Sequence, residues 1–273
     1  MATKKHIPPI TAVKQEAIMH ARRIIIIPLV IIVAALLSGC TQGNIRIHGT
    51  GSNQGTDGIQ GVGDMVSRDF QTGDFEIISI NVPFVVIWNE SPQTSVTVEM
   101  QENLFGQLLI NVRDGILLVE SLEPFDVSSP NIPRIYITSQ NLIELSSDIA
   151  IFTEGWDTVK ADIFAIDLTG AAVIDIPLDV DTLLVYVDEA GASLTFSGNA
   201  DYASYVVEGG VTISAFDLQT ADTRVEFTGA GSIEVNASNT LDVSIVGAGT
   251  VRHKGNPTVT QSITGLGSVT SAD

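Results

Sequence analysis

The feature that most constrains the fold is a short glycine-containing pattern that recurs at nearly even spacing from residue 145 onward. Its clearest copies span residues 227–233, 245–251 and 263–269, and weaker copies lie at 168–174, 190–194 and 207–213. The first small residue of each copy stands at 170, 190, 209, 229, 247 or 265, so successive copies are 18 to 20 residues apart. A period in this range is typical of solenoid proteins, in which each repeat contacts only its neighbours.

Apolar residues occupy matching positions in successive copies and alternate with polar residues. The alternation has a period of two on both sides of the glycines, which predicts two short strands per repeat joined by a tight turn. Glycine suits such a turn because it lets backbones stack closely. The column four positions after the first small residue contains Ile174, Leu194, Ile213, Ile233, Val251 and Val269, and the column two positions before it contains Leu168, Asp188, Val207, Phe227, Ile245 and Ile263.

Asp188 interrupts the second column with a charged side chain. A one-residue bulge would remove the conflict, because it would turn Leu183, Val185 and Val187 towards the core instead. Antiparallel hairpins could also produce the alternation. Like residues in register favour parallel stacking, in which each coil lays its Ile or Val on the coil below. The sequence therefore predicts an all-β fold, a parallel β-solenoid with coils of 18–20 residues over 145–271.

Residues 66–144 lack the repeat but still read as strands. Arg113-Asp114-Gly115 is a hairpin signal between two of them, and residues 101–105 are expected to form one helical turn. We expect this part to build the first, less regular coils and to cap the solenoid. The predicted strands are 75–80, 84–88, 95–99, 107–112 and 116–120.

The start of the chain has the three parts of an export signal: the basic Arg22-Arg23, a short apolar run over 24–36, and the small pair Ser38-Gly39 before Cys40. The run Leu37 to Cys40 resembles the bacterial lipobox, in which the cysteine is acylated and becomes the first residue. The alternative is a retained transmembrane anchor, which needs about 20 apolar residues. We expect a signal peptide over 1–39 and a lipid anchor at Cys40; translation could start at Met1 or Met19.

Residues 40–65 are predicted to form a flexible tether, because seven of the 25 residues from 41 to 65 are glycine. A phosphate-binding loop would need a strand before it and a helix after it, and neither is predicted. The signal holds 5 of the 13 basic and 1 of the 32 acidic residues, so residues 40–273 carry 8 basic and 31 acidic residues, a net charge of −23. This field repels phosphate backbones and argues against nucleic-acid binding.

The order of motifs resembles the bacterial putative auto-transporter adhesin family with the head GIN domain. The resemblance covers residues 66–271 and implies an envelope-located β-solenoid, often lipid-anchored, with an inferred adhesion role and no catalytic residues. Lys254 stands near the place where the family pattern has a tyrosine. The matching stretches are 68–70, 75–80, 83–87, 95–99, 102–104, 112–115, the Gly-Ala-Gly-Ser-Ile series and 254–257.

The sequence offers little for catalysis. His253 is the one histidine of the predicted folded part, so no Ser-His-Asp or Cys-His set can be built without a second candidate base. We expect His253 to be exposed on a terminal coil. Residues 179–181 and 188–189 contain carboxylates that could bind calcium. Acidic residues mostly form ordinary solvated surface, and this second interpretation is favoured. Trp88 and Trp156 could stack on sugars, although such residues more often pack in the interior.

We therefore predict a non-enzymatic binding or adhesion module, with no catalytic, metal or cofactor site. Contacts would run along a flat face of the solenoid and be helped by divalent cations. The expected partners are the membrane, through acylated Cys40, and glycans or other envelope polymers. Thr41, rather than Asp, follows the cysteine, which indicates the outer membrane or cell surface. The alternative is a carbohydrate-active β-helix enzyme, which a groove lined by clustered carboxylates would favour.

Overall fold

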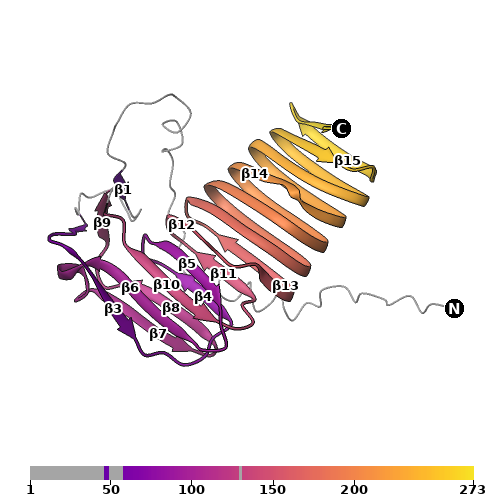
Figure 1. Cartoon of the computed structure of the whole chain (residues 1–273). Coiled ribbons are helices and arrows are strands. Elements are labelled where there is room, and N and C mark those ends of the chain that lie inside the picture. The colour runs from indigo at the N-terminus through magenta and orange to yellow at the C-terminus, as the bar shows by residue number, and fades with distance from the viewer. Residues whose placement is uncertain (1–45, 49–57, 129–130) are drawn as a thin grey trace. The chain divides into compact units, whose positions relative to one another are not determined.

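The repeats form the coils of a parallel β-solenoid (Figure 1). The computed structural model describes residues 46–48, 58–128 and 131–273, all within the unit Leu36–Asp273. The signal peptide, Cys40 and most of the expected tether lie outside the described residues. The elements are β1 (Arg46–His48), β2 (Ile59–Gln60), β3 (Met65–Phe70), β4 (Ile77–Ile80), β5 (Val85–Glu90), β6 (Ser95–Gln101), the 3₁₀ helix η1 (Glu102–Leu104), β7 (Leu108–Arg113), β8 (Ile116–Ser121), β9 (Phe125–Ser128), β10 (Arg134–Ser139), β11 (Glu144–Ser147), β12 (Ile151–Thr153), β13 (Val159–Leu168), β14 (Ala172–Lys254), β15 (Thr258–Gly265) and β16 (Ser268–Ser271).

Parallel pairing in the predicted register confirms the solenoid. β14 passes through successive corners and forms several stacked coils (Figure 1), and it pairs in parallel with β13, β15 and β16. Ile245 lies beside Ile263 in this ladder, and Val251 lies beside Val269. Like residues therefore stack on like residues, as the columns of the repeat require.

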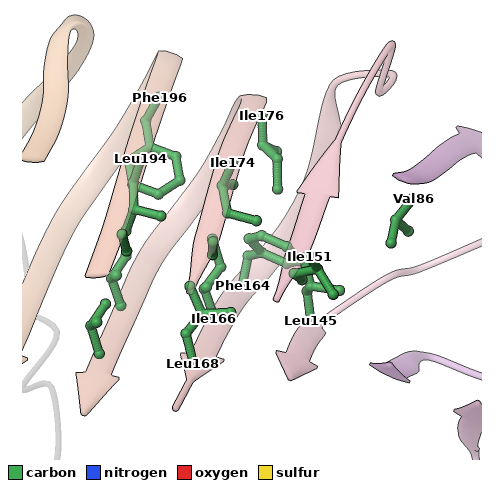
Figure 2. Close-up of a cluster of buried hydrophobic side chains, with 14 of the residues drawn as sticks. Val86, Leu145, Ile151, Phe164, Ile166, Leu168, Ile174, Ile176, Leu194 and Phe196 are labelled. Carbon is green, nitrogen blue, oxygen red and sulfur yellow. The ribbon is translucent and has the colours of Figure 1, made fainter. Parts of the chain in front are cut away.

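The core is one continuous hydrophobic cluster along the inside of the coils. Ile174, Leu194 and Ile233 are at most 1% exposed. Figure 2 shows side chains of neighbouring coils pointing towards one another within this core. The cluster and the residues packed against it lie between residues 59 and 269, so a fragment over 41–273 retains all of them together with the sheet pairing. Such contiguous burial is the main source of stability for the fold.

The inward orientation predicted for Leu183, Val185 and Val187 is confirmed. Val185 pairs with Ile166 and Val187 pairs with Leu168, and both valines are at most 2% exposed. The side chain of Asp188 is left at the half-buried surface instead of in the core. The chain thus avoids burying an unpaired carboxylate, which would cost several kcal/mol.

Each coil has a third side that the sequence pattern does not reveal. The pair Val159 and Leu178 and the pair Ala161 and Val180 lie in register in the parallel ladder of β13 and β14, before the ladder continues to Leu168 and Val187. The prediction of two strands per repeat is therefore incomplete. Only some coils carry a glycine with positive φ next to this side, as at Gly198 and Gly255, so its start does not recur as a glycine pattern.

The N-terminal part forms coils in an unexpected spatial order. β4 pairs in parallel with β8 on one side and β11 on the other, while β5 pairs in parallel with β10 and β12. The coil made of β4 and β5 therefore lies between a coil made of β8 and β10 and a coil made of β11 and β12. The sequence predicted irregular first coils, but it did not predict that the chain returns to both sides of the first one.

Antiparallel strands extend the sheet beyond the coil made of β8 and β10, which agrees with the expected capping role. β3 pairs with β6, β6 pairs with β10, and β7 pairs with β8, all antiparallel. Asp114 and Gly115 have φ of 53° and 77° and close the predicted hairpin between β7 and β8. η1 is the predicted helical turn.

The folded part begins earlier than residue 66, where the sequence placed its boundary. β1 and β2 pair with β9 in a separate three-stranded sheet, and the side chain of Ile59 packs against the core. Residues 46–48 and 58–65 therefore belong to the fold and not to a free tether. In the part of the chain described here, no helix has the length and apolar character needed to cross a membrane.

Candidate functional site

A polar hollow of about 730 Å³ lies on the third side of the coils. It crosses several coils, because its lining comes from β13 and from successive turns of β14. Ligand sites are usually concave, with a few polar groups that converge on them. The lining residues are Lys160, Ala161, Asp162, Asp179, Val180, Asp181, Asn199, Ala200, Asp201, Gln219, Thr220, Ala221, Asn236 and Ser238.

Three neighbouring positions of each coil build the hollow. The register aligns Lys160 with Asp179 and Ala161 with Val180, and the later coils continue these columns. The middle positions are small or buried, whereas the positions on either side are exposed and polar except at half-buried Ala221. The middle column consists of Ala161, Val180, Ala200 and Thr220; the flanking columns consist of Lys160, Asp179, Asn199 and Gln219, and of Asp162, Asp181, Asp201 and Ala221.

The hollow is negatively charged at one end of its length. Four exposed aspartates line it, and its one lysine, Lys160, forms an ion pair outside the lining, 3.1 Å from Glu90. Because this pair is largely exposed, it adds little to stability, about 0–1 kcal/mol. The carboxylates are Asp162, Asp179, Asp181 and Asp201.

Hydrogen bonds hold the other end of the hollow in place. The buried hydroxyl groups of Thr220 and Thr223 lie 2.7 Å apart, and Thr220 Oγ1 donates to the carbonyl oxygen of Asn236 at 2.9 Å. Ser238 Oγ donates to the carbonyl oxygen of Thr220, and Asn236 Nδ2 donates to that of Phe216. This end therefore presents amide and hydroxyl groups on a backbone fixed by side chains, which favours a preorganised site.

Clustered carboxylates in a groove are the feature that would favour the enzyme alternative, but the other features of this hollow suit binding better than proton transfer. A carboxyl group that serves as a general acid at neutral pH usually sits in a desolvating environment, and the four aspartates are exposed. Histidine does not line the hollow. The described residues contain no group of three or more His, Cys, Asp or Glu side chains arranged to hold a metal ion. Amide, hydroxyl and carboxylate groups remain, and these recognise a hydroxyl-rich ligand by hydrogen bonds.

The clustering of carboxylates in this hollow was missed by the sequence reasoning. The column five positions after the first small residue mixes acidic, basic and neutral side chains, and the hollow is built from other positions of each coil. Asp179 and Asp181, weighed as calcium ligands, line the hollow, whereas Asp188 does not. A ladder of small residues, Ala161, Val180, Ala200 and Thr220, was the signal that could have located the third side.

Two other expectations on individual residues are decided by the structure. His253 was expected to be exposed, but it faces the same side as buried Val251, and its Nδ1 is buried without a hydrogen-bond partner among the described residues. Trp88 and Trp156 are 1% and 7% exposed, so they pack in the core rather than stack on sugars. Their indole nitrogens donate to Ser139 Oγ and to the carbonyl oxygen of Val86. The lipid-anchor candidate, Cys40, lies outside the described residues.

Several solved structures share this fold. A putative adhesin from Bacteroides fragilis NCTC 9343 has a TM-score of 0.72 and 22% identity, with coverage of 78% of this chain and 100% of that chain. A putative adhesin from Parabacteroides merdae ATCC 43184 has a TM-score of 0.61 and 20% identity, with coverage of 79% and 99%. A putative lipid binding protein from Parabacteroides distasonis ATCC 8503 has a TM-score of 0.60 and 24% identity, again with coverage of 79% and 99%.

The family comparison agrees with the resemblance seen in the motifs. No curated protein matches the sequence. The family model described as putative auto-transporter adhesin, head GIN domain, matches residues 74–257. This range is well over half of the chain and contains every strand from β4 to β14, including the hollow. The chain therefore belongs to the family of putative auto-transporter adhesins with the head GIN domain.

Proposed function

We propose that this protein is a non-enzymatic adhesion module of the bacterial cell envelope that binds a carbohydrate polymer along the hollow of its third side. The observation that carries this proposal is the repetition of polar side chains across successive coils in a concave surface. A polymer that lies along the solenoid axis would meet similar groups at each coil. Weak contacts that repeat in this way gain affinity by avidity.

A carbohydrate fits the hollow better than a lipid chain does. The walls carry amide, carboxylate and hydroxyl groups, which bind hydroxyl-rich ligands, and the hollow offers few apolar side chains that could cover an acyl chain. The description of one structural neighbour as a putative lipid binding protein concerns that protein. The net charge of −23 over residues 40–273 favours neutral polymers, or acidic ones that are bridged by divalent cations.

The location that goes with this role is the envelope surface, as the family description suggests. We infer that Cys40 carries the lipid and holds the protein on the outer membrane, because the small pair Ser38-Gly39 precedes the cysteine and Thr41 follows it. The chain between Cys40 and β2 is rich in glycine, so it would give the solenoid freedom to reach a polymer.

The test is a binding measurement with the purified fragment 41–273. A glycan array identifies the polymer, and calorimetry compares Asn199→Ala and Gln219→Ala with the wild-type fragment. Each substitution removes an exposed amide from the wall of the hollow. Loss of one hydrogen bond is expected to weaken binding about fivefold. Glu208→Gln is the matched control, because Glu208 is exposed on β14 and does not line the hollow.

Two results would contradict the proposal. Unchanged binding in both amide variants would place the contact elsewhere. Turnover of the polymer that Asp181→Asn abolishes would show that the clustered aspartates act as catalysts, and the protein would then be a carbohydrate-active enzyme. The release of reducing ends measures this turnover directly.

A further inference from the structure

The last coil of the solenoid has an open hydrogen-bonding edge. β15 and β16 each pair with β14 on one side, and no strand among the described residues pairs with their other side. An unpaired edge presents a row of N–H and C=O groups to any strand that approaches it. The opposite end of the described fold differs, because antiparallel β3, β6 and β7 extend it.

The hydrophobic core is also uncovered at this edge. Leu241 and Ile245 are at most 1% exposed, but their register partners Val259 and Ile263 are each 37% exposed. Leu266, in the turn between β15 and β16, is 90% exposed. An exposed row of apolar groups beside an open strand edge is typical of an interaction surface. Every residue of β15 is exposed.

This end of the chain differs from the rest in its lack of charged side chains. Residues 255–272 contain no Asp, Glu, Lys or Arg, although the chain as a whole has 32 acidic residues and a net charge of −19. Charged side chains commonly protect edge strands against pairing, and here they are absent from the strand. Two copies of such an acidic chain repel one another at most orientations, and the repulsion is weaker where the uncharged stretches 255–272 face each other, with Asp273 as the one charged side chain after them.

We propose that this edge binds a second copy of the same chain. β15 of one copy would pair antiparallel with β15 of the other across a two-fold axis, which would extend the sheet and cover Val259, Ile263 and Leu266. In a two-fold contact, each side chain near the axis meets the same side chain of the other copy. Charged residues would create like-charge pairs there, whereas Thr, Ser and Gln pair without such a cost. The uncharged composition of residues 255–272 is therefore the composition that self-pairing requires.

The first test is the oligomeric state of the fragment 41–273 at pH 8 and 0.15 M salt. Sedimentation velocity over a range of concentrations should show a monomer–dimer equilibrium. Leu266→Glu should raise the dimer dissociation constant at least about tenfold, and it should not disturb folding because the side chain is exposed. Val173→Glu is the control, since Val173 is 46% exposed on an early coil of β14. A monomer at all concentrations, or a dimer that Leu266→Glu leaves intact, would overturn the proposal.

The second test locates the contact. The fragment 41–273 contains no cysteine, so a single introduced thiol reports on one position. Ser262→Cys in β15 should be linked to its mate by a short bis-maleimide. Ser244→Cys is the matched control, because Ser244 occupies the same register position one coil further from the edge. Efficient linkage at Ser262 alone supports the proposed pairing. Equal linkage at both positions, or linkage at Ser244 alone, would refute it.

Discussion

Gly229 and Gly247 stack in successive coils so closely that a Cβ atom on Gly247 would lie 2.3 Å from the carbonyl oxygen of Gly229. Both residues also have positive φ, of 138° and 125°. The obstructing atom belongs to the backbone and cannot swing away as a side chain would. Glycine is thus required at these positions of the repeat for two reasons: the backbone conformation and the close approach of the coils.

Gly247→Ala is therefore expected to destabilise the fragment 41–273 strongly. The strained φ alone costs about 1–3 kcal/mol, and the overlap with the coil below adds to it. Urea unfolding followed by circular dichroism measures the loss. Gly106→Ala is the control, because a Cβ there meets nothing within 4 Å and its φ is not positive. Equal effects of the two substitutions would contradict the stacking argument.

Ile233 and Glu234 test the inward and outward faces of β14. Ile233 is 0% exposed, so Ile233→Asp would bury an unpaired carboxylate and should cost about 4 kcal/mol or more. The sequence alone placed Glu234 in water. The structure adds an ion pair with Arg252 at 2.8 Å, so Glu234→Gln should cost about 0–1 kcal/mol. A similar fall in the urea midpoint for both variants would show that the faces are assigned incorrectly.

The stability of the fragment should fall at alkaline pH because of Tyr205. Burial raises the pKa of its phenol well above the ordinary value of 10.0, so the folded state keeps a proton that the unfolded state loses. The free energy of unfolding should therefore decline as the pH rises above about 10, by up to about 1.4 kcal/mol per pH unit for this group, until the folded-state pKa is reached. Below pH 10 the group should have no such effect.

Urea unfolding at pH 8.5 and pH 11 measures this decline. Tyr205→Phe should reduce the difference between the two pH values, whatever it does to stability at pH 8.5. Tyr202→Phe is the control, because the Tyr202 side chain is only half-buried. If the Tyr205 variant lost as much stability as the wild-type fragment between the two pH values, another group would be responsible.

The proposed lipid anchor at Cys40 predicts a simple labelling result for the full chain in a bacterial host. Cys40→Ser should abolish incorporation of an alkyne-tagged palmitate and release the protein from the detergent phase, because each buried CH₂ of an acyl chain contributes about 0.8 kcal/mol to membrane binding. Thr41→Ser, which leaves the cysteine in place, should remain labelled. Absence of label on the wild-type chain would exclude acylation of Cys40.

The repeat predicted the core of β14 well, because the burial of each side chain depends on its position within a single coil. Alternation decides which side chains face inward, and even spacing decides which coils meet, so Ile174, Leu194 and Ile233 could be placed from the sequence. The same reasoning resolved the conflict at Asp188. It failed at Val269, which is only partly buried, because no further coil among the described residues covers it.

The hollow and the order of the first coils could not be predicted in this way. Alternation assigns residues to a face but does not name the neighbouring strand. The pairing of Ile78 with both Leu117 and Leu145 joins segments far apart in a region without a repeat. His253 was misplaced for a related reason: it was expected to be exposed on a terminal coil, whereas the strand alternation places it on the face of buried Val251, where it is half-buried.

The position of the coil made of β4 and β5 has a consequence for how the chain can assemble. Its neighbours on both sides, β8 and β10 and then β11 and β12, come later in the sequence. A chain that emerges with its N-terminus first therefore holds this coil without a partner until β8 and β10 have emerged, and with its second side open until residue 153 has emerged. Open strand edges and uncovered apolar groups invite wrong pairing during that interval. Each coil of β14, in contrast, docks on one that already exists. The beginning of this solenoid must form as a unit, while its later part can grow by one coil at a time.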